Sequence, residues 1–323
     1  MSAKIKVLVC SASPDQVNHN AVLRGYVGRG FSEILPQGHV LTCSLDYAVE
    51  AAKRFHPELV VVFGSCMPAS CDYTGLRTYC SRNDAAMVFW LHDDPYEFDF
   101  NYKIYQYADL IFSNDKWAVT HINHPNVYHL PLAADPQAHF RDIKSEMDRD
   151  VFFCGVGFPN RRQLLIDCAE VLSPFHVEVL GAEWPDTPDF CRNTRVPNEA
   201  LPSFYAASLV TLNIGRRFNL ANSKYQMDAT TPGPRTFEAA MAGAVQCAYL
   251  EGLELMDYFT FGEEILVFDS PSELRTVVDE LRSDPLLRQQ IAEKSQARAM
   301  RDHTYAARAR VILSKLTSDV TVP

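Results

Sequence analysis

Short apolar runs alternate with helical patterns along the whole chain, and this alternation constrains the fold more than any other feature. The first apolar runs are rich in β-branched and aromatic residues and are bounded by turn residues. Runs that are apolar on both faces are typical of strands in a parallel sheet. They occupy residues 6–10, 59–63, 86–91 and 110–113, with helical patterns over 21–35 and 47–55. The pattern predicts a doubly wound α/β domain.

A second α/β unit follows a change in composition. Residues 133–150 are polar and charged and have no strand pattern. Beyond them, strand candidates cover 151–155, 177–180, 209–214, 245–249 and 265–268, and helical patterns cover 161–172, 271–282 and 284–313, the last as one long or broken helix. The Ser-Pro-Ser-Glu sequence at 270–273 is typical of a capped helix start.

We therefore expect two Rossmann-like domains that face each other across a cleft. The predicted boundaries are an N-terminal domain of residues 1–135, a linker of 136–150, a C-terminal domain of 151–300 and a final helix of 301–323. Residues 130–136 resemble a strand that leads into the hinge. Because ligands of open α/β sheets bind at the carboxyl ends of the strands, the chemistry should lie in the loops that follow them.

Composition narrows the class of protein. The chain is 47% hydrophobic and 22% charged, as in soluble globular proteins, and no apolar run is long enough to span a membrane. Nine scattered cysteines without paired Cys-x-x-Cys spacing predict free thiols in the cytoplasm. The net charge of −10 argues against broad binding to nucleic acid or anionic membranes, although arginines could still converge in one cleft.

The sequence PRTFEAAMAGAVQC, residues 234–247, suggests a binding site for a nucleoside diphosphate. Prolines at 232 and 234 prevent an earlier helix start, so Arg235 and Glu238 fall in its first turns. The N-terminus of a helix favours phosphate, and a carboxylate can accept hydrogen bonds from vicinal sugar hydroxyls. The alternative is an alanine-rich packed helix that begins with a charged pair.

Two further loops carry arginines at expected strand ends. GVGFPNRR brings Gly155 and Gly157, which allow a ligand close to the backbone, together with Arg161 and Arg162. Asn160 stands where a dinucleotide motif would have its third glycine, and a tight turn with solvated arginines is the alternative.

The sequence TLNIGRRFN, residues 211–219, is the second of these loops. It offers Asn213, Arg216 and Arg217, and an arginine there could grip a phosphate in bidentate fashion. A surface loop with a salt bridge is the alternative.

The sequence WLHDDPYEFDF, residues 90–100, follows a strong strand candidate in the first domain. His92 or Asp93 could act as a general base on an acceptor hydroxyl. The alternatives are a carboxylate metal site, which lacks a second ligand cluster, and a turn built on Asp94 before proline. The loop after the first strand could line the acceptor pocket. Candidates for the acceptor side are Ser13, Asn18, His19 and Asp94.

In order, the motifs HDDP, VYHLPLAADP, DVFFCGVGFPNRRQLL, LNIGRR, PRTFEAAMAGA, GEEILVFDSPSEL and RDHTYAARARVIL resemble the CgeB-like glycosyltransferases of the GT-B superfamily. The resemblance covers most of residues 110–313. It implies that Glu238 binds the donor ribose, and that Arg235 and the N–H groups of Thr236 and Phe237 lie near the diphosphate. It also places Arg216 and the loop 155–162 at the phosphates, 195–197 with Val196 at the nucleobase, and the final helix back on the first domain.

One departure from the family pattern bears on the mechanism. Many retaining relatives have a second acidic residue eight positions before the ribose-binding glutamate, where this chain has Thr230. Inversion would instead require a base on the first domain, such as His92 or Asp93. The two stereochemical courses stay open.

The resemblance thus implies a Leloir-type hexosyl- or pentosyltransferase that uses a nucleotide-sugar donor, with UDP-sugars favoured. No permanently bound cofactor and no metal are expected. The acceptor, whether a small molecule, a glycan, a protein or a modified nucleobase, is not assigned by the sequence. A nucleotide-sugar 2-epimerase of the same fold and a non-catalytic nucleotide-sugar-binding protein are the alternatives.

Overall fold

The computed structural model describes residues 5–17, 21–67 and 71–319 and divides the chain into two compact units. The first unit comprises Met1–Leu132, Asn219–Thr230 and Thr304–Pro323, and the second comprises Ala133–Phe218 and Thr231–His303. The first unit therefore takes in two segments from the second half of the chain. No sequence pattern predicted that the shorter one, 219–230, would belong to this unit.

The first unit contains six parallel strands in the order β2-β1-β3-β4-β5-β6. The predicted strands 59–63, 86–91 and 110–113 are confirmed, because each is buried on both faces. Neither β2, a partly exposed edge strand, nor β6, with three residues, has that apolar signal. The predicted strand over 130–136 is wrong, since β6 ends at residue 129. The strands are β1 Val7–Ser11, β2 Val40–Cys43, β3 Leu59–Phe63, β4 Ala86–Leu91, β5 Leu110–Ser113 and β6 Val127–His129.

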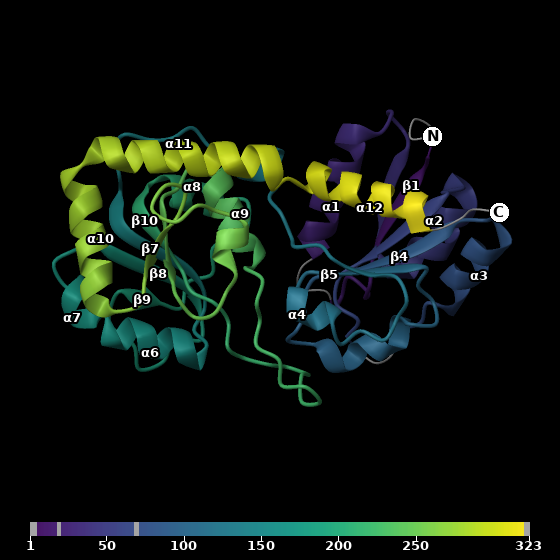
Figure 1. The fold of residues 1–323 in the computed structure, drawn as a ribbon, viewed down its shortest axis with the longest axis horizontal. Helices are drawn as coiled ribbons and strands as arrows, with labels where there is room; N and C mark the ends of the chain where they lie inside the picture. Colours follow the sequence, from purple (N-terminus) through teal and green to yellow (C-terminus); the bar gives the residue numbers. More distant parts are fainter. Residues whose placement is uncertain (1–4, 18–20, 68–70, 320–323) are drawn as a thin grey trace. The chain divides into compact units, whose positions relative to one another are not determined.

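Helices cover both faces of this sheet (Figure 1). Helices α2 and α3 pack on the face that carries Leu8, Val60 and Met87. Helices α1 and α12 lie side by side, and α1 also contacts β1 and β2. The α-helices of the unit are α1 Ala21–Ile34, α2 Ala48–Phe55, α3 Thr74–Arg82, α4 Lys116–Val119 and α12 Tyr305–Asp319, with 3-10 turns at Leu45–Tyr47 and Phe98–Ile104.

The contact between α1 and α12 depends on a glycine. A Cβ atom on Gly30 would lie 2.5 Å from the backbone carbonyl carbon of Tyr305, so any side chain there would push the helices apart. The Tyr305 ring also lies 6.1 Å from the rings of Tyr26 and Trp90. The buried Arg308 donates hydrogen bonds to the carbonyls of residues 131 and 132, at 2.9 and 3.2 Å. The final helix is thus an integral part of the first unit.

Two carboxylates hold segment 219–230 on the first unit. Asp99 accepts hydrogen bonds from the amide and hydroxyl of Ser223, both at 2.7 Å. Asp115, which is fully buried and caps α4, accepts the amide of Thr230 at 2.7 Å. Tyr225 adds a ring contact with His121, with centroids 4.6 Å apart.

The second unit contains six parallel strands in the order β12-β11-β10-β7-β8-β9. Numbered from β7, this is the doubly wound order 3-2-1-4-5-6, which reverses direction between β7 and β10. In such sheets the ligand lies at the carboxyl ends of the strands beside the reversal point. The strands are β7 Arg149–Val156, β8 Val177–Ala182, β9 Cys191–Arg192, β10 Ser208–Asn213, β11 Gln246–Tyr249 and β12 Leu266–Phe268.

Alternating residues of β7 pack into two different layers of this unit. Val151 and Phe153 face the layer of α6, α7 and α10, whereas Phe152 faces α8 and α9. The predicted helix over 161–172 is two helices, and the pattern over 284–313 breaks between α11 and α12. The predicted linker contains α5 and the start of β7. The helices are α5 Pro136–His139, α6 Pro159–Asp167, α7 Ala169–Leu172, α8 Leu201–Ala206, α9 Pro234–Met241, α10 Pro271–Ser283 and α11 Pro285–Asp302, with a 3-10 turn at Leu255–Asp257.

Within the described residues, no helix combines the length and the apolar character needed to cross a membrane. All nine cysteines have free thiols. The Ser270 hydroxyl accepts the amide of Glu273 at 3.4 Å, so the predicted cap of α10 is confirmed.

We expect Gly30→Ala to weaken the docking of α12, because the added methyl group would overlap the backbone of Tyr305. Overpacking of this kind costs about 1–3 kcal/mol, which thermal unfolding would detect as a lower Tm. Gly25→Ala is the matched control on the same helix, since its nearest neighbour is the end of the Arg29 side chain at 3.9 Å. Equal Tm values for the two variants would contradict the close approach.

Candidate functional site

Helix α9 begins with a charged pair on its first turns. Gly233 is the N-cap residue, in extended conformation, and Pro234 is the first helical residue. The Arg235 Nη1 atom lies 2.6 Å from Glu238 Oε2. The Glu238 side chain is 3% exposed, whereas that of Arg235 is 45% exposed. The pair therefore has a buried anionic end and a cationic end that solvent reaches.

The surroundings of this pair fix both partners. The second terminal nitrogen of Arg235 donates to Asn198 Oδ1 at 2.8 Å. On the other side of the carboxylate, His139 Nε2 lies 3.6 Å from Glu238 Oε1. Burial opposes the charge of Arg235, but the Glu238 carboxylate outweighs it and raises the pKa of the guanidinium. Arg235 is a permanent cation here.

Thr236 and Asn213 connect α9 to the end of β10. The Asn213 amide donates to the Thr236 hydroxyl at 2.6 Å, and the Gln246 amide donates to the Thr236 carbonyl at 3.0 Å. The Thr236 amide donates to the Gly233 carbonyl at 3.2 Å, so this N–H already has a partner, and its predicted place near the diphosphate stays a prediction. Phe237 is fully buried, in a cluster with Tyr258 and His303.

The first turn of α6, which follows β7, is hydrogen-bonded to the loop after β10 at the reversal point of the sheet. The Arg161 guanidinium donates to the carbonyls of Ile214 and Gly215 at 2.9 and 3.1 Å. The Asn160 amide also donates to the Gly215 carbonyl, at 3.1 Å. The structure thus gives Arg161 a bracing role that the sequence did not indicate, and its predicted phosphate contact stays a prediction.

A buried glutamate, Glu251, anchors the same loop. Its carboxylate accepts the Gly215 amide and lies 3.4 Å from Arg217 Nε. Burial raises the pKa of Glu251 above its ordinary value. Arg216 donates to the Phe218 carbonyl at 2.8 Å and lies over the ring of Phe158 at 5.2 Å. Both arginines of the predicted phosphate loop therefore have protein partners that restrict their positions: Glu251 for Arg217, and Phe158 and Phe218 for Arg216.

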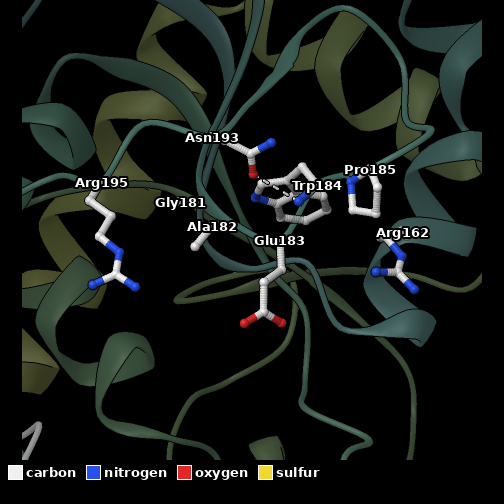
Figure 2. A pocket seen from close by; sticks show the side chains of 8 residues that line it. All are labelled: Arg162, Gly181, Ala182, Glu183, Trp184, Pro185, Asn193 and Arg195. Atoms are coloured by element: carbon white, nitrogen blue, oxygen red, sulfur yellow. Dashed lines mark hydrogen bonds between the residues drawn. The ribbon is translucent and has the colours of Figure 1, made fainter.

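The described part of the second unit contains a pocket of about 600 Å³ at the end of β8. Figure 2 shows Trp184 between Asn193 and Pro185, with the charged ends of Arg162 and Arg195 on opposite sides of Glu183. The Trp184 amide donates to Asn193 Oδ1 at 2.9 Å. The lining residues are Arg162, Gly181, Ala182, Glu183, Trp184, Pro185, Asn193 and Arg195.

Glycines bring the β7 and β8 ends together at this pocket. Gly181 has a φ of +144°, and a Cβ atom on it would lie 1.8 Å from the Gly155 carbonyl oxygen. A Cβ atom on Gly157 would lie 2.3 Å from the Glu183 carbonyl oxygen. The indole N–H of Trp184 donates to the Gly155 carbonyl at 3.2 Å. Gly157 and Gly181 thus allow the ends of β7 and β8 to pack closely, whereas Gly155 contributes its carbonyl to this contact.

A short segment links the pocket to helix α9. Arg195 lines the pocket, and Asn198, three residues later, binds Arg235. Val196, the predicted nucleobase residue between them, is partly buried beside the α8 and α9 layer. The pocket, the segment 195–198 and the start of α9 are therefore connected to one another.

In the first unit, His92 and Asp93 form a hydrogen-bonding pair at the end of β4. His92 Nδ1 lies 2.9 Å from Asp93 Oδ2, and the histidine side chain is 3% exposed. The other ring nitrogen, Nε2, is buried without a hydrogen-bond partner among the described residues. Burial opposes protonation, but the carboxylate of Asp93 outweighs it and raises the pKa of His92.

Asp94 belongs to a buried network rather than to an open pocket. Its carboxylate accepts hydrogen bonds from Ser113 at 2.6 Å and Asn101 at 2.8 Å. The predicted acceptor-side role of Asp94 is therefore not supported by its surroundings. Ser13 is also buried, at 3% exposure, while Asn18 and His19 lie outside the described residues.

Sequence reasoning missed four residues of the second unit that shape this region. Trp184 and Asn193 form the pocket wall, and Glu251 and His139 lie beside the arginine loop and Glu238. The tryptophan directly after a strand end was an available signal, but His139 fell in the predicted linker. Among the described residues, no group of three or more His, Cys, Asp or Glu side chains could hold a metal ion.

Residues 161–314 match the family model described as glycosyl transferase-like. This range contains α9 and all eight lining residues of the pocket. That part of the chain is similar to the glycosyl transferase-like family. The spore protein CgeB of Bacillus subtilis is 25% identical over 185 residues, which are 52% of this chain and 57% of CgeB. These two findings confirm the resemblance to CgeB-like glycosyltransferases, although the match spans little more than half the length of the curated relative.

Solved structures confirm the GT-B fold. The chain superposes on Anabaena HepE, solved with UDP and glucose, with a TM-score of 0.64 at 12% identity, covering 98% of this chain and all of HepE. It superposes on the T4 phage BGT, solved with its UDP-glucose substrate, with a TM-score of 0.61 at 13% identity, covering 98% and 99% of the two chains. At such identities the likeness concerns the fold alone.

We expect the buried Asp94 to make stability depend on pH. Burial raises the pKa of this carboxyl to about 6, whereas an aspartate in an unfolded chain titrates near ~3.9. The folded state therefore keeps a proton that the unfolded state loses, and this contribution to stability falls as the pH rises from about 4 to 6.

Asp94→Asn removes this titration, so the two proteins should diverge with pH. The unfolding free energy of the wild type, relative to the variant, should fall by about 2–3 kcal/mol between pH 4 and pH 7. Urea unfolding at several pH values measures the difference. A difference that does not change with pH would show that Asp94 titrates normally.

Proposed function

We propose that this protein transfers a sugar from a nucleoside-diphosphate sugar, with UDP favoured, to an acceptor hydroxyl. The observation that carries the proposal is the buried Glu238 carboxylate, fixed by Arg235 at the start of α9 within the glycosyl transferase-like region. A carboxylate held in this way is an acceptor-only group, suited to the two hydroxyls of a ribose.

The donor's diphosphate would bind where positive charge is fixed. The start of α9 carries a partial positive charge, and Arg235 adds a permanent cation with a half-exposed side chain. Arg216 and Arg217, on the loop after β10, supply further cations. These groups would stabilise the negative charge that develops on the departing nucleoside diphosphate. The proposed transfer needs no metal or permanently bound cofactor.

The pocket at the end of β8 is our candidate for the nucleobase. Its volume of about 600 Å³ lies within the usual ~300–1,000 Å³ of small-ligand sites. It offers polar groups on Asn193, Arg195 and Glu183, and the segment 195–198 leads from it to Arg235. UDP is favoured because the Anabaena and T4 phage proteins were solved with UDP or UDP-glucose.

His92 is our candidate for the general base. Because Asp93 faces Nδ1, the neutral ring carries its proton there and presents a lone pair at Nε2. A Cβ atom on Gly64 would lie 3.6 Å from Nε2, so the absence of a side chain leaves space beside that nitrogen. His92 would accept the proton of the acceptor hydroxyl while the oxygen forms a bond to the anomeric carbon. The bond between the anomeric carbon and the diphosphate oxygen breaks at the same time. Because the acceptor oxygen attacks opposite the leaving group, the configuration of the anomeric carbon is inverted.

We expect Glu238→Gln to weaken UDP binding about 10- to 150-fold, since a hydrogen bond to a charged group contributes about 1.5–3 kcal/mol. Isothermal titration calorimetry with UDP measures the effect, with GDP and ADP as comparison ligands. Glu263→Gln is the control, because this exposed glutamate pairs with Lys294 and should leave affinity unchanged. Wild-type affinity in the Glu238 variant would remove this residue from the donor site.

We expect His92→Ala to slow sugar transfer about 10²- to 10⁴-fold while UDP binding stays unchanged, as for the loss of a general base. Because the acceptor is unassigned, the assay is release of UDP from UDP-sugars, with water or a screened alcohol as acceptor. His176→Ala, an exposed histidine of the second unit, serves as the control. Full turnover by the His92 variant would return this residue to a structural role.

A further inference from the structure

His139 is the last residue of the short helix α5 and lies against the donor-site glutamate. Its side chain is 2% exposed, and Glu238 is 3% exposed. The separation of 3.6 Å between His139 Nε2 and Glu238 Oε1 is that of an electrostatic pair rather than a hydrogen bond. Helix α5 packs on α9, so the two side chains face each other within the second unit. Nothing in the proposed donor chemistry so far uses this histidine.

Two backbone groups of Asp135 bear on the tautomer of His139. Its Nδ1 atom lies 2.9 Å from the Asp135 amide nitrogen, whose N–H it can accept, and 3.1 Å from the Asp135 carbonyl oxygen, to which a protonated Nδ1 would donate. Because that carbonyl already accepts the amides of Ala138 and His139, Nδ1 is assigned as the acceptor, which leaves the proton of a neutral ring on Nε2. Burial lowers the pKa of His139 despite the opposing effect of Glu238 and Asp135, and Arg235 lowers it further. The ring is therefore neutral near pH 7 and presents an N–H group to Glu238 Oε1.

The two oxygens of Glu238 thus have different neighbours. Oε2 accepts a charge-assisted hydrogen bond from Arg235 at 2.6 Å, and Oε1 faces His139. A carboxylate held from one side only could rotate about its last bond, whereas electrostatic attraction between its other oxygen and a second N–H group restrains that rotation. Each oxygen keeps lone pairs for a ligand hydroxyl.

We propose that His139 is a positioning residue that orients the Glu238 carboxylate for the ribose hydroxyls of the donor. This inference rests on the proposed function, because the orientation that His139 would maintain, that of the Glu238 carboxylate, matters only if Glu238 binds the donor. Removal of the ring N–H should weaken donor binding through Glu238, because the proposal gives His139 no direct contact with the donor.

The test compares two substitutions in the full chain. His139→Leu removes the N–H, and UDP should bind about 10-fold more weakly, with KM for a UDP-sugar raised and kcat largely kept. His139→Gln places an amide N–H near the position of Nε2 and should restore most of the affinity. Rescue by glutamine but not by leucine distinguishes positioning from packing.

Arg288→Leu controls for the general effect of removing a buried donor. Arg288 is 4% exposed and donates to the Lys144 carbonyl at 2.6 Å, so its loss should lower Tm without changing UDP affinity. Unchanged UDP affinity in His139→Leu, or equal weakening in both His139 variants, would overturn the proposal. If the wild type binds no nucleoside diphosphate, the proposed function fails instead.

A measurement without ligand tests the contact itself. NMR titration of the histidine rings should show the Nε2–H tautomer for His139, and Glu238→Gln should lower the pKa of this ring, because the carboxylate raises it. A His139 ring that titrates identically in both proteins would overturn the proposal even if UDP binds. The two measurements therefore distinguish an error in the His139–Glu238 contact from an error in the assignment of the donor site.

Discussion

The buried carboxylate of Glu238 is the constraint around which the second unit is organised. Removing one partner of a buried ion pair typically costs about 3–5 kcal/mol, because the remaining charge is left without compensation. Arg235 supplies the compensating charge, and Asn198 in turn fixes Arg235. That requirement ties the start of α9 to the segment before α8, and through this segment to the pocket at the end of β8. The compensation of the Glu238 charge thus brings Arg235, Asn198 and the pocket segment together.

The same logic accounts for the departure at Thr230. Many retaining relatives have an acidic residue eight positions before the glutamate, but here the buried Asp115 carboxylate accepts the Thr230 amide at 2.7 Å and its hydroxyl at 3.4 Å, so an acidic side chain at this position would face a like charge. Asp99 fixes Ser223 in the same way. These two carboxylates belong to loops that follow β4 and β5, so segment 219–230 is part of the first unit. Thr230 therefore has an anchoring role that the family pattern alone did not reveal.

The sequence predicted the fold well where burial is complete on both faces of a strand. β3, β4 and β5 have the predicted bounds because each is a short, uninterrupted apolar run, which fits a strand buried on both faces. β2, β6 and β9 were missed because short edge strands carry little apolar signal. The residues of the proposed donor region were selected by motif, but the sequence did not predict the direction of their side chains. Arg161 braces carbonyls and His139 faces Glu238, and both facts depend on contacts between segments far apart in sequence.

The local electrostatics reconcile an acidic protein with the anionic donor that we propose for it. The net charge is −10, yet Arg217 and Arg235 each pair with a glutamate that is almost fully buried, while their own side chains are 58% and 45% exposed. The buried carboxylate fixes the position of each guanidinium and still leaves a face of the cation toward solvent. Cations held in this way lose little further freedom when an anion binds, and they need no reorganisation as charge develops during the reaction. The acidic surface elsewhere does not weaken them greatly, because salt screens charges beyond about 8–10 Å.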